Sequence, residues 1–228
     1  MGGCYARLVA LAVTPPGVRV KPRLRGVTHQ WAFFSAIPLG ILVGLYADTS
    51  RARVAGAVFA ASVVAMFGAS ALYHRVTWSP SVRPWLRRLD HACIYGLIAG
   101  SYTPFGLLVL SGEWRITVLA IVWTGAAAAI ALRFLWIGAP KWLAAVIGIA
   151  LGWVGVLVFP QLLARTGVLA SLLVLAGGLC YTLGAIVYAV RKPDPFPSVF
   201  GYHELFHALV VAAVAFQYVT VAFFVLPR

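Results

Sequence analysis

Seven long apolar stretches, almost free of charge, constrain the fold of this chain more than any other feature. A hydrocarbon core about 30 Å thick takes roughly 17–25 residues to cross as a helix. The stretches that qualify are Trp31–Ala47, Val54–Tyr73, His91–Leu110, Ile116–Leu132, Trp142–Phe159, Val168–Val190 and Leu205–Leu226. The short alternating strands of a membrane barrel are absent from the sequence, so helices must satisfy the backbone inside the lipid. We predict an all-α integral membrane protein in which residues 21–228 form a single domain, a seven-transmembrane helical bundle.

The charged residues support this class and predict an orientation. Only 10% of the 228 residues are charged and the net charge is +13, whereas a soluble domain carries about 25% charged residues. A basic excess of this kind can indicate nucleic-acid binding, but in a membrane protein it collects in cytoplasmic loops. With the N-terminus inside, 13 Lys and Arg lie on the cytoplasmic side and 5 outside. We therefore predict a cytoplasmic N-terminus, an outside C-terminus, no nucleic-acid partner and a location in the bacterial inner membrane.

The N-terminal residues and the cysteines carry little chemistry. The apolar run Leu8–Val13 is too short for a signal peptide, and prolines 15 and 16 follow it directly. Residues 1–20 are predicted to be a flexible tail. The three cysteines, Cys4, Cys93 and Cys180, have no paired spacing, so a disulfide framework or a cysteine-based zinc site is not supported.

Ionisable residues inside membrane spans are candidates for function because they are costly there. His74 ends the second apolar stretch and Asp90 opens the third, while His203 and His207 begin the seventh. In the predicted topology all four lie at the cytoplasmic side. Independent helices would therefore bring three histidines and a carboxylate to the same leaflet.

The spacing of these residues is typical of a metal site. His203 and His207 are four residues apart and share one helix face, as do Ser70 and His74. Catalytic zinc commonly takes three protein ligands and leaves one position for water. We predict zinc ligands at His74, His203 and His207, with Asp90 holding or deprotonating the water and Ser70 close by. His91 is interpreted instead as interfacial or structural, because it points about 100° away from Asp90 on a helix. His29, just before the first apolar stretch, is interpreted as interfacial.

At these residues the chain resembles the hemolysin III family. The motifs KPRLRGVTHQW, SALYHR, LRRLDHACIYGLIAGSYTPF and FGYHELFH occur in that family's order and spacing. The family is similar to the progestin and adipoQ receptors and to the alkaline ceramidases, a superfamily of seven-helix proteins regarded as metal-dependent hydrolases. The resemblance implies zinc on His74, His203 and His207, with Asp90 near its water and Ser70 in the S-x-x-x-H pattern. The relatives do not require an acid at the position of Glu204.

Three functions are compatible with this pattern. The leading hypothesis is a zinc-dependent hydrolase that acts on a membrane lipid amide or ester at the cytoplasmic leaflet. The second is a non-enzymatic protein, either a receptor-like sensor or a pore-forming cytolysin, in which zinc is structural. The third is an intramembrane protease, because His203–His207 reads as H-E-x-x-H with Glu204 as the base. The oligomeric state and the lipid itself are not encoded in any pattern of the sequence.

Overall fold

The computed structural model describes residues 21–136 and 138–227, and within these residues nearly all regular structure is helical. The helices are α2 (Val27–Leu45), α3 (Ser50–Arg75), α4 (Arg83–Pro104), α5 (Glu113–Leu135), α6 (Lys141–Gly152), α7 (Phe159–Val190) and α8 (Tyr202–Thr220). Short π-helical segments follow α4 and α8, at Phe105–Val109 and Val221–Val225, and a 3₁₀ segment, Trp153–Val158, follows α6. The only β-pairing among the described residues is an isolated bridge between Phe196 and Phe200. The predicted tail, residues 1–20, lies outside the described residues.

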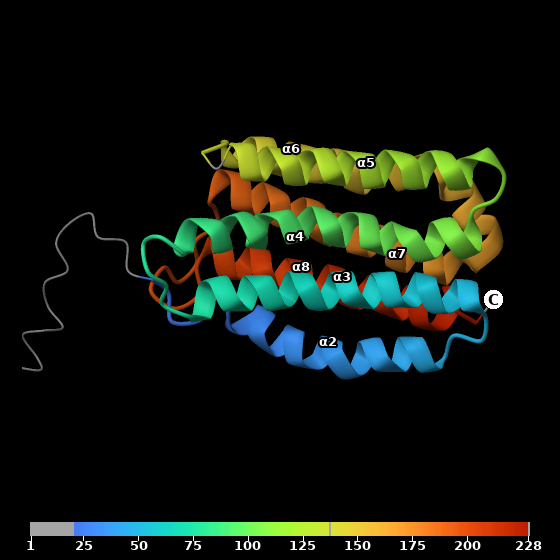
Figure 1. Ribbon diagram of the computed structural model, residues 1–228, viewed down its shortest axis with the longest axis horizontal. Coiled ribbons are helices and arrows are strands. Elements are labelled where there is room, and N and C mark those ends of the chain that lie inside the picture. Colours follow the sequence, from blue (N-terminus) through green and yellow to red (C-terminus); the bar gives the residue numbers. More distant parts are fainter. Residues whose placement is uncertain (1–20, 137, 228) are drawn as a thin grey trace, which may run out of the picture.

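The helices run side by side along the long axis of the molecule (Figure 1). Along the chain, each of the helices α2 to α8 packs against the next, and α8 also contacts α2, so the helices close into a ring. The helix interfaces use small residues: Ala52, Ala55, Ala99, Ala126 and Ala213 are almost completely buried. Small side chains allow close helix packing where no water drives association. The bundle interior is thus built for close contact.

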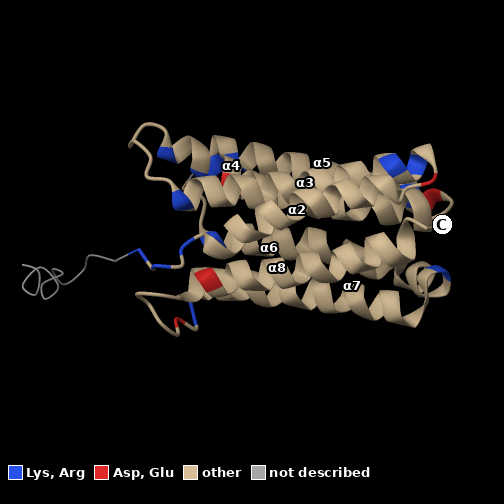
Figure 2. Ribbon diagram, turned by 90° about the horizontal axis from the view of Figure 1, so that it is seen from below, with Lys and Arg blue, Asp and Glu red and all other residues tan. Residues whose placement is uncertain are grey.

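The outer surface of the bundle is apolar. Large hydrophobic side chains are exposed on several helices, including Leu45, Ile116 and Leu135, the last of which is 86% exposed. Six helical segments are long and apolar enough to cross a membrane. Lys and Arg lie toward the two ends of the bundle, and the helix middles are free of charge (Figure 2). These features define an integral membrane helical bundle, as predicted.

One of the six segments, Lys141–Val190, is 50 residues long and cannot be a single straight rod. Gly167 in α7 has non-helical backbone angles, φ 84° and ψ 174°. The indole N–H of Trp153 donates to Thr182 Oγ1 at 2.9 Å, although 29 residues of straight helix would separate these positions by about 43 Å. The chain therefore turns back within this segment, and α6 packs against α7.

Candidate metal centre

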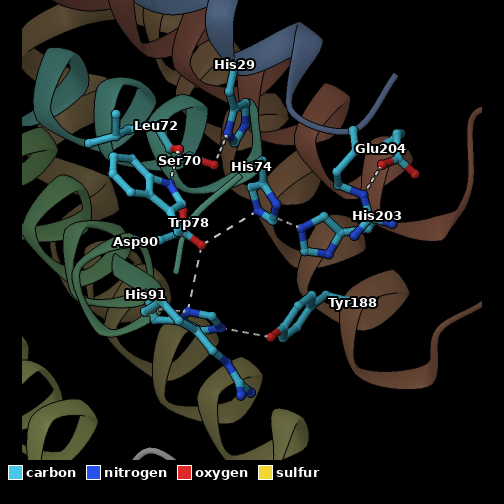
Figure 3. Close-up of polar contacts among 12 residues, drawn as sticks. His29, Ser70, Leu72, His74, Trp78, Asp90, His91, Tyr188, His203 and Glu204 are labelled. Carbon is cyan, nitrogen blue, oxygen red and sulfur yellow. Dashed lines mark hydrogen bonds and ion pairs between the residues drawn. The ribbon is translucent and has the colours of Figure 1, made fainter. Parts of the chain in front are cut away.

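Three histidines from two helices meet at one end of the bundle, where α3 ends and α8 begins. His74 lies in the last turn of α3, and His203 and His207 lie in the first two turns of α8. Each offers one ring nitrogen, and these atoms all lie within 4.8 Å of one another. The Nε2 atoms of His74 and His203 face each other at 3.2 Å (Figure 3). The structure therefore brings together the three residues predicted as ligands.

The local sequence explains why α8 begins where it does. Gly201 is extended, and its N–H donates to Glu204 Oε2 at 2.9 Å, while the N–H of Tyr202 donates to Asp194 Oδ1 at 2.8 Å. Side-chain acceptors that bind the free N–H groups of a first turn stabilise a helix start. This start places His203 and His207 one turn apart, facing α3.

Glu204 is held away from the histidine cluster. Its second carboxylate oxygen, Oε1, accepts a hydrogen bond from Arg25 Nε in an ion pair, and its side chain is almost completely buried. Arg25 reaches it because the segment before α2 pairs with the loop before α8, through Arg23 N–H to Ser198 O and Leu24 N–H to Val199 O, both at 3.0 Å. Glu204 lies on the side of His203 that faces away from Asp90 (Figure 3). Its contacts are those of a helix cap.

Asp90 lies beside the cluster, on the second turn of α4. Its Oδ2 is 3.7 Å from His74 Nε2 and 3.7 Å from His91 Nδ1. His91 also contacts the hydroxyl of Tyr188, with Nε2 3.1 Å from the phenolic oxygen. The prediction that His91 points away from Asp90 is therefore wrong. Its ring extends the polar network, because its Nδ1 turns back toward Asp90 and the Arg87 carbonyl.

Ser70 and His29 form the other wall of the site. The Ser70 hydroxyl is buried, 2.8 Å from His29 Nδ1, and it interacts with the Asp90 side chain. The His29 ring stacks on His207, with ring centroids 3.8 Å apart and planes inclined by 8°. His29 is only 2% exposed, so its interpretation as an interfacial residue is wrong. Its place in the motif RGVTHQW, in the first turn of α2, is the available signal, since a histidine there needs a polar partner once buried.

The donor set fits a metal ion. Three neutral imidazoles are a typical set for zinc and related divalent metals. With Zn–N distances of about 2.0–2.1 Å in a tetrahedron, two ligand nitrogens lie about 3.3 Å apart, close to the 3.2 Å between His74 and His203. In addition, His207 Nδ1 is buried without a hydrogen-bond partner, and an unsatisfied buried nitrogen is costly. The donor chemistry and the spacing are compatible with a three-histidine metal-binding site.

The cluster opens into a cavity of about 210 Å³ inside the ring of helices. His203, His207, Asp90 and Ser70 line one end, and Gln217 on α8 lines it farther along. Since His203 and Gln217 are 14 residues apart on one helix, the cavity follows α8 for about 21 Å. Most residues between them are apolar, among them Ile98, Phe105, Leu162, Val174 and Val210. The site therefore joins a polar end to a long apolar chamber.

The end of the bundle that holds the cluster is strongly cationic. The pKa of Lys21 lies below its usual value. Partial burial is the main cause, and the positive charges of Arg75, Arg25 and Arg83 add to it. Arg25 is neutralised by Glu204, and Arg75 Nε donates to the amide oxygen of Gln30 at 2.7 Å. Negative ligands are thus favoured at this end of the molecule.

A helical membrane bundle with three histidines, a carboxylate and an internal apolar chamber defines a class of membrane protein with a candidate metal centre. The sequence matches the family model described as "Haemolysin-III related" over residues 18–218. The chain is 32% identical to "Hemolysin-3" of Bacillus cereus, over 88% of this chain and 90% of that protein. It is 28% identical to "Hemolysin-3 homolog" of Bacillus subtilis (strain 168), over 87% and 91%. The chain belongs to the haemolysin-III related family.

The wider superfamily is also represented among the similar proteins. The chain is 25% identical to the human "Monocyte to macrophage differentiation factor", over 84% of this chain and 79% of that protein. This similarity extends the resemblance from bacterial relatives to proteins of mammals, in agreement with the link to the adipoQ receptors.

Proposed function

We propose that this protein is a metal-dependent hydrolase that cleaves a lipid amide or ester within the membrane. The observation that carries this proposal is the junction between the three-histidine cluster and the apolar chamber. A soluble substrate has no need of a chamber lined by hydrocarbon, whereas an acyl chain is stabilised there by burial. A ligand whose tail lies along α8 would present its carbonyl group at the polar end.

His74, His203 and His207 would hold the metal, with zinc as the ion that best suits three imidazoles. Zinc bound in this way supplies a water whose pKa is lowered toward about 7 and polarises a carbonyl oxygen. The protein's own contribution is to present three neutral nitrogens in a region where water is scarce. His74 and His203 face each other already, so little rearrangement is required.

Asp90 and Ser70 would carry the proton and the developing charge. Asp90 Oδ2, 3.7 Å from His74 Nε2, is placed to accept a proton from a water beside the cluster and to return it to the leaving group. The Ser70 hydroxyl can donate a hydrogen bond to the oxyanion that forms at the carbonyl carbon. His29 Nδ1 lies 2.8 Å from the same hydroxyl, and in the tautomer with a proton on Nδ1 it would donate to the Ser70 oxygen and leave the hydroxyl proton free for this bond.

The depth and side of the site follow from the proposed topology. Seven crossings are supported by the turn at Gly167 and by the positions of the ends: the described chain starts at the cluster end and finishes at the other (Figure 1). An odd number of crossings is required for that arrangement. The 13 to 5 distribution of Lys and Arg supports a cytoplasmic position for the cluster end. Lipid carbonyls of the cytoplasmic leaflet lie at this level.

A structural metal is the second candidate function. The histidines lie at the end of α3 and the start of α8. An ion bound there would hold these two distant parts of the chain together. In this case the protein would be a receptor-like sensor or a pore-former with a structural metal. The protease alternative has less support, because both oxygens of Glu204 are already engaged by Arg25 and Gly201.

The test combines metal analysis with a substrate panel. We expect purified protein to contain zinc, and His74→Ala, His203→Ala and His207→Ala each to lose it. His91→Ala, which removes a histidine outside the cluster, should keep the metal. Retention of metal in all three cluster variants would exclude the site. A fully loaded protein that cleaves no member of a broad panel of lipid amides and esters would exclude the hydrolase and leave the structural role.

A further inference from the structure

Arg133 is a buried cation that has no anionic partner. It lies in the last turn of α5 and is only 5% exposed, and its Nε and Nη2 atoms are buried without hydrogen-bond partners. A guanidinium removed from water and left unpaired is costly, and natural proteins pair such groups. The position at a helix C-terminus provides some compensation, but it supplies no acceptor to these two nitrogens.

The chain has no carboxylate available for Arg133. Among its five acidic residues, Glu204 pairs with Arg25, Asp194 accepts the N–H of Tyr202, and Asp90 contacts His74 and His91. Glu113 begins α5, 20 residues and about 30 Å from Arg133, and Asp48 precedes α3 at that same end. The residues outside the described ranges, 1–20, 137 and 228, include no Asp or Glu side chain. The two nitrogens are therefore free to bind an anion from another molecule.

The place of Arg133 identifies the kind of molecule. Its side chain lines the same cavity as Asp90, His203 and His207, and it is an electrostatic neighbour of His91 and Tyr188. Lys141 adds a second cation nearby, with its Nζ 4.4 Å from the centre of the Tyr188 ring and 3.0 Å from the Tyr202 hydroxyl. The polar end of the chamber thus has cations on one side and the histidine cluster on the other.

We propose that Arg133 binds the oxyanion of an amphipathic ligand whose hydrocarbon part occupies the chamber. The free Nε and Nη2 atoms form one edge of the guanidinium, and this edge donates two parallel hydrogen bonds to a phosphate or a carboxylate. The inference rests on the proposed function, because it names the substrate class of the same cavity. The oxyanion is either the phosphate of a lipid substrate or the carboxylate of a released fatty acid.

The experiment measures binding rather than turnover, so that it stands apart from the test of hydrolysis. The purified full-length protein is titrated with phosphatidic acid, a long-chain fatty acid, diacylglycerol and inorganic phosphate, and bound ligand is followed by native mass spectrometry. We expect Arg133→Gln to weaken binding of the anionic lipid by about tenfold or more, as loss of a charge-assisted contact does. Arg133→Lys keeps the charge but cannot donate two parallel hydrogen bonds, so its affinity should be intermediate. This variant also tests the proposal if Arg133→Gln fails to fold.

Arg83→Gln is the matched control, because Arg83 is exposed at the same end of the bundle and its loss removes the same charge. It should leave the affinity nearly unchanged. Preference for phosphatidic acid would identify a headgroup, and preference for the fatty acid a product; both support the proposal. Equal binding of diacylglycerol, an equal loss in Arg83→Gln, or binding of inorganic phosphate alone would overturn it. Arg133-dependent lipid binding without any turnover would keep this inference and exclude the hydrolase.

Discussion

At the scale of single residues, the site depends on a glycine that precedes α2. Gly26 has φ 78° and ψ 0°, the left-handed conformation, which costs about 1–2 kcal/mol for a residue with a side chain. A Cβ atom at this position would lie 2.6 Å from the Cβ of His74. Glycine is therefore required both by the turn and by the close approach of the backbone to a candidate ligand.

We expect Gly26→Ala to weaken metal binding because the new methyl group would displace His74. Metal content after dialysis against a weak chelator measures the effect. Gly112→Ala is the control: Gly112, at φ 61° and ψ −148°, occupies a region almost restricted to glycine, yet a Cβ atom there would contact nothing within 4 Å. If both variants lose metal equally, backbone strain rather than contact with His74 is responsible.

Single residues also show the limit of sequence reasoning at the site. His74, Asp90, His203 and His207 were found because charged or metal-binding groups inside apolar stretches stand out. The prediction that His29 is interfacial is wrong because its ring stacks on His207, which is about 180 residues away in the sequence. Arg133 appeared in the sequence as one more cytoplasmic charge, and only burial distinguishes it from the exposed arginines.

At the scale of helices, the start of α8 decides how the string HELFH is used. The sequence alone left Glu204 open as a catalytic base, since H-E-x-x-H on a helix is a peptidase motif. The fold instead gives both of its oxygens to the Gly201 N–H and to Arg25. A carboxylate engaged in this way stabilises the first turn, and with it the positions of His203 and His207.

We expect Glu204→Gln to keep the metal and to lower the free energy of unfolding by roughly 1–3 kcal/mol, the typical cost of a lost hydrogen bond to a charged group. Thermal unfolding and metal analysis of the same sample measure the two effects. A variant that is loaded with metal, folds normally and is inactive would favour the protease and contradict the cap.

At the scale of the whole molecule, the ring of helices creates the chamber and sets the two ends apart. Most helix starts agree with the predicted stretches to within four residues, because hydrophobic length is a local property. The exceptions are α4 and α7, which begin 8 and 9 residues before the predicted stretches. The turn near Gly167 falls at the break between the predicted stretches Trp142–Phe159 and Val168–Val190. The non-helical backbone angles of Gly167, the packing of α6 against α7 and the hydrogen bond from Trp153 to Thr182 show that the chain reverses there.

The proposed topology predicts which loops face the cytoplasm. In a chain whose cysteines are replaced, we expect Ser81→Cys, in the exposed loop before α4, to react with a membrane-impermeant thiol reagent only from the cytoplasmic side. Asp48→Cys, in the exposed loop between α2 and α3, should react only from outside. Labelling of both positions from the same side would contradict a crossing by α3, and labelling of each position from the opposite side would contradict the predicted orientation.

The sequence by itself determined the membrane class, the helical form and the residues that can bind a metal, because hydrophobic length and rare polar groups are properties of the local sequence. Only the tertiary structure decided which polar groups share a site. It stacks His29 on His207, turns His91 toward Asp90, and withdraws Glu204 into a cap. These outcomes depend on contacts between segments far apart in the chain, namely His29 with His207, His91 with Tyr188 and Glu204 with Arg25, and no local pattern contains them.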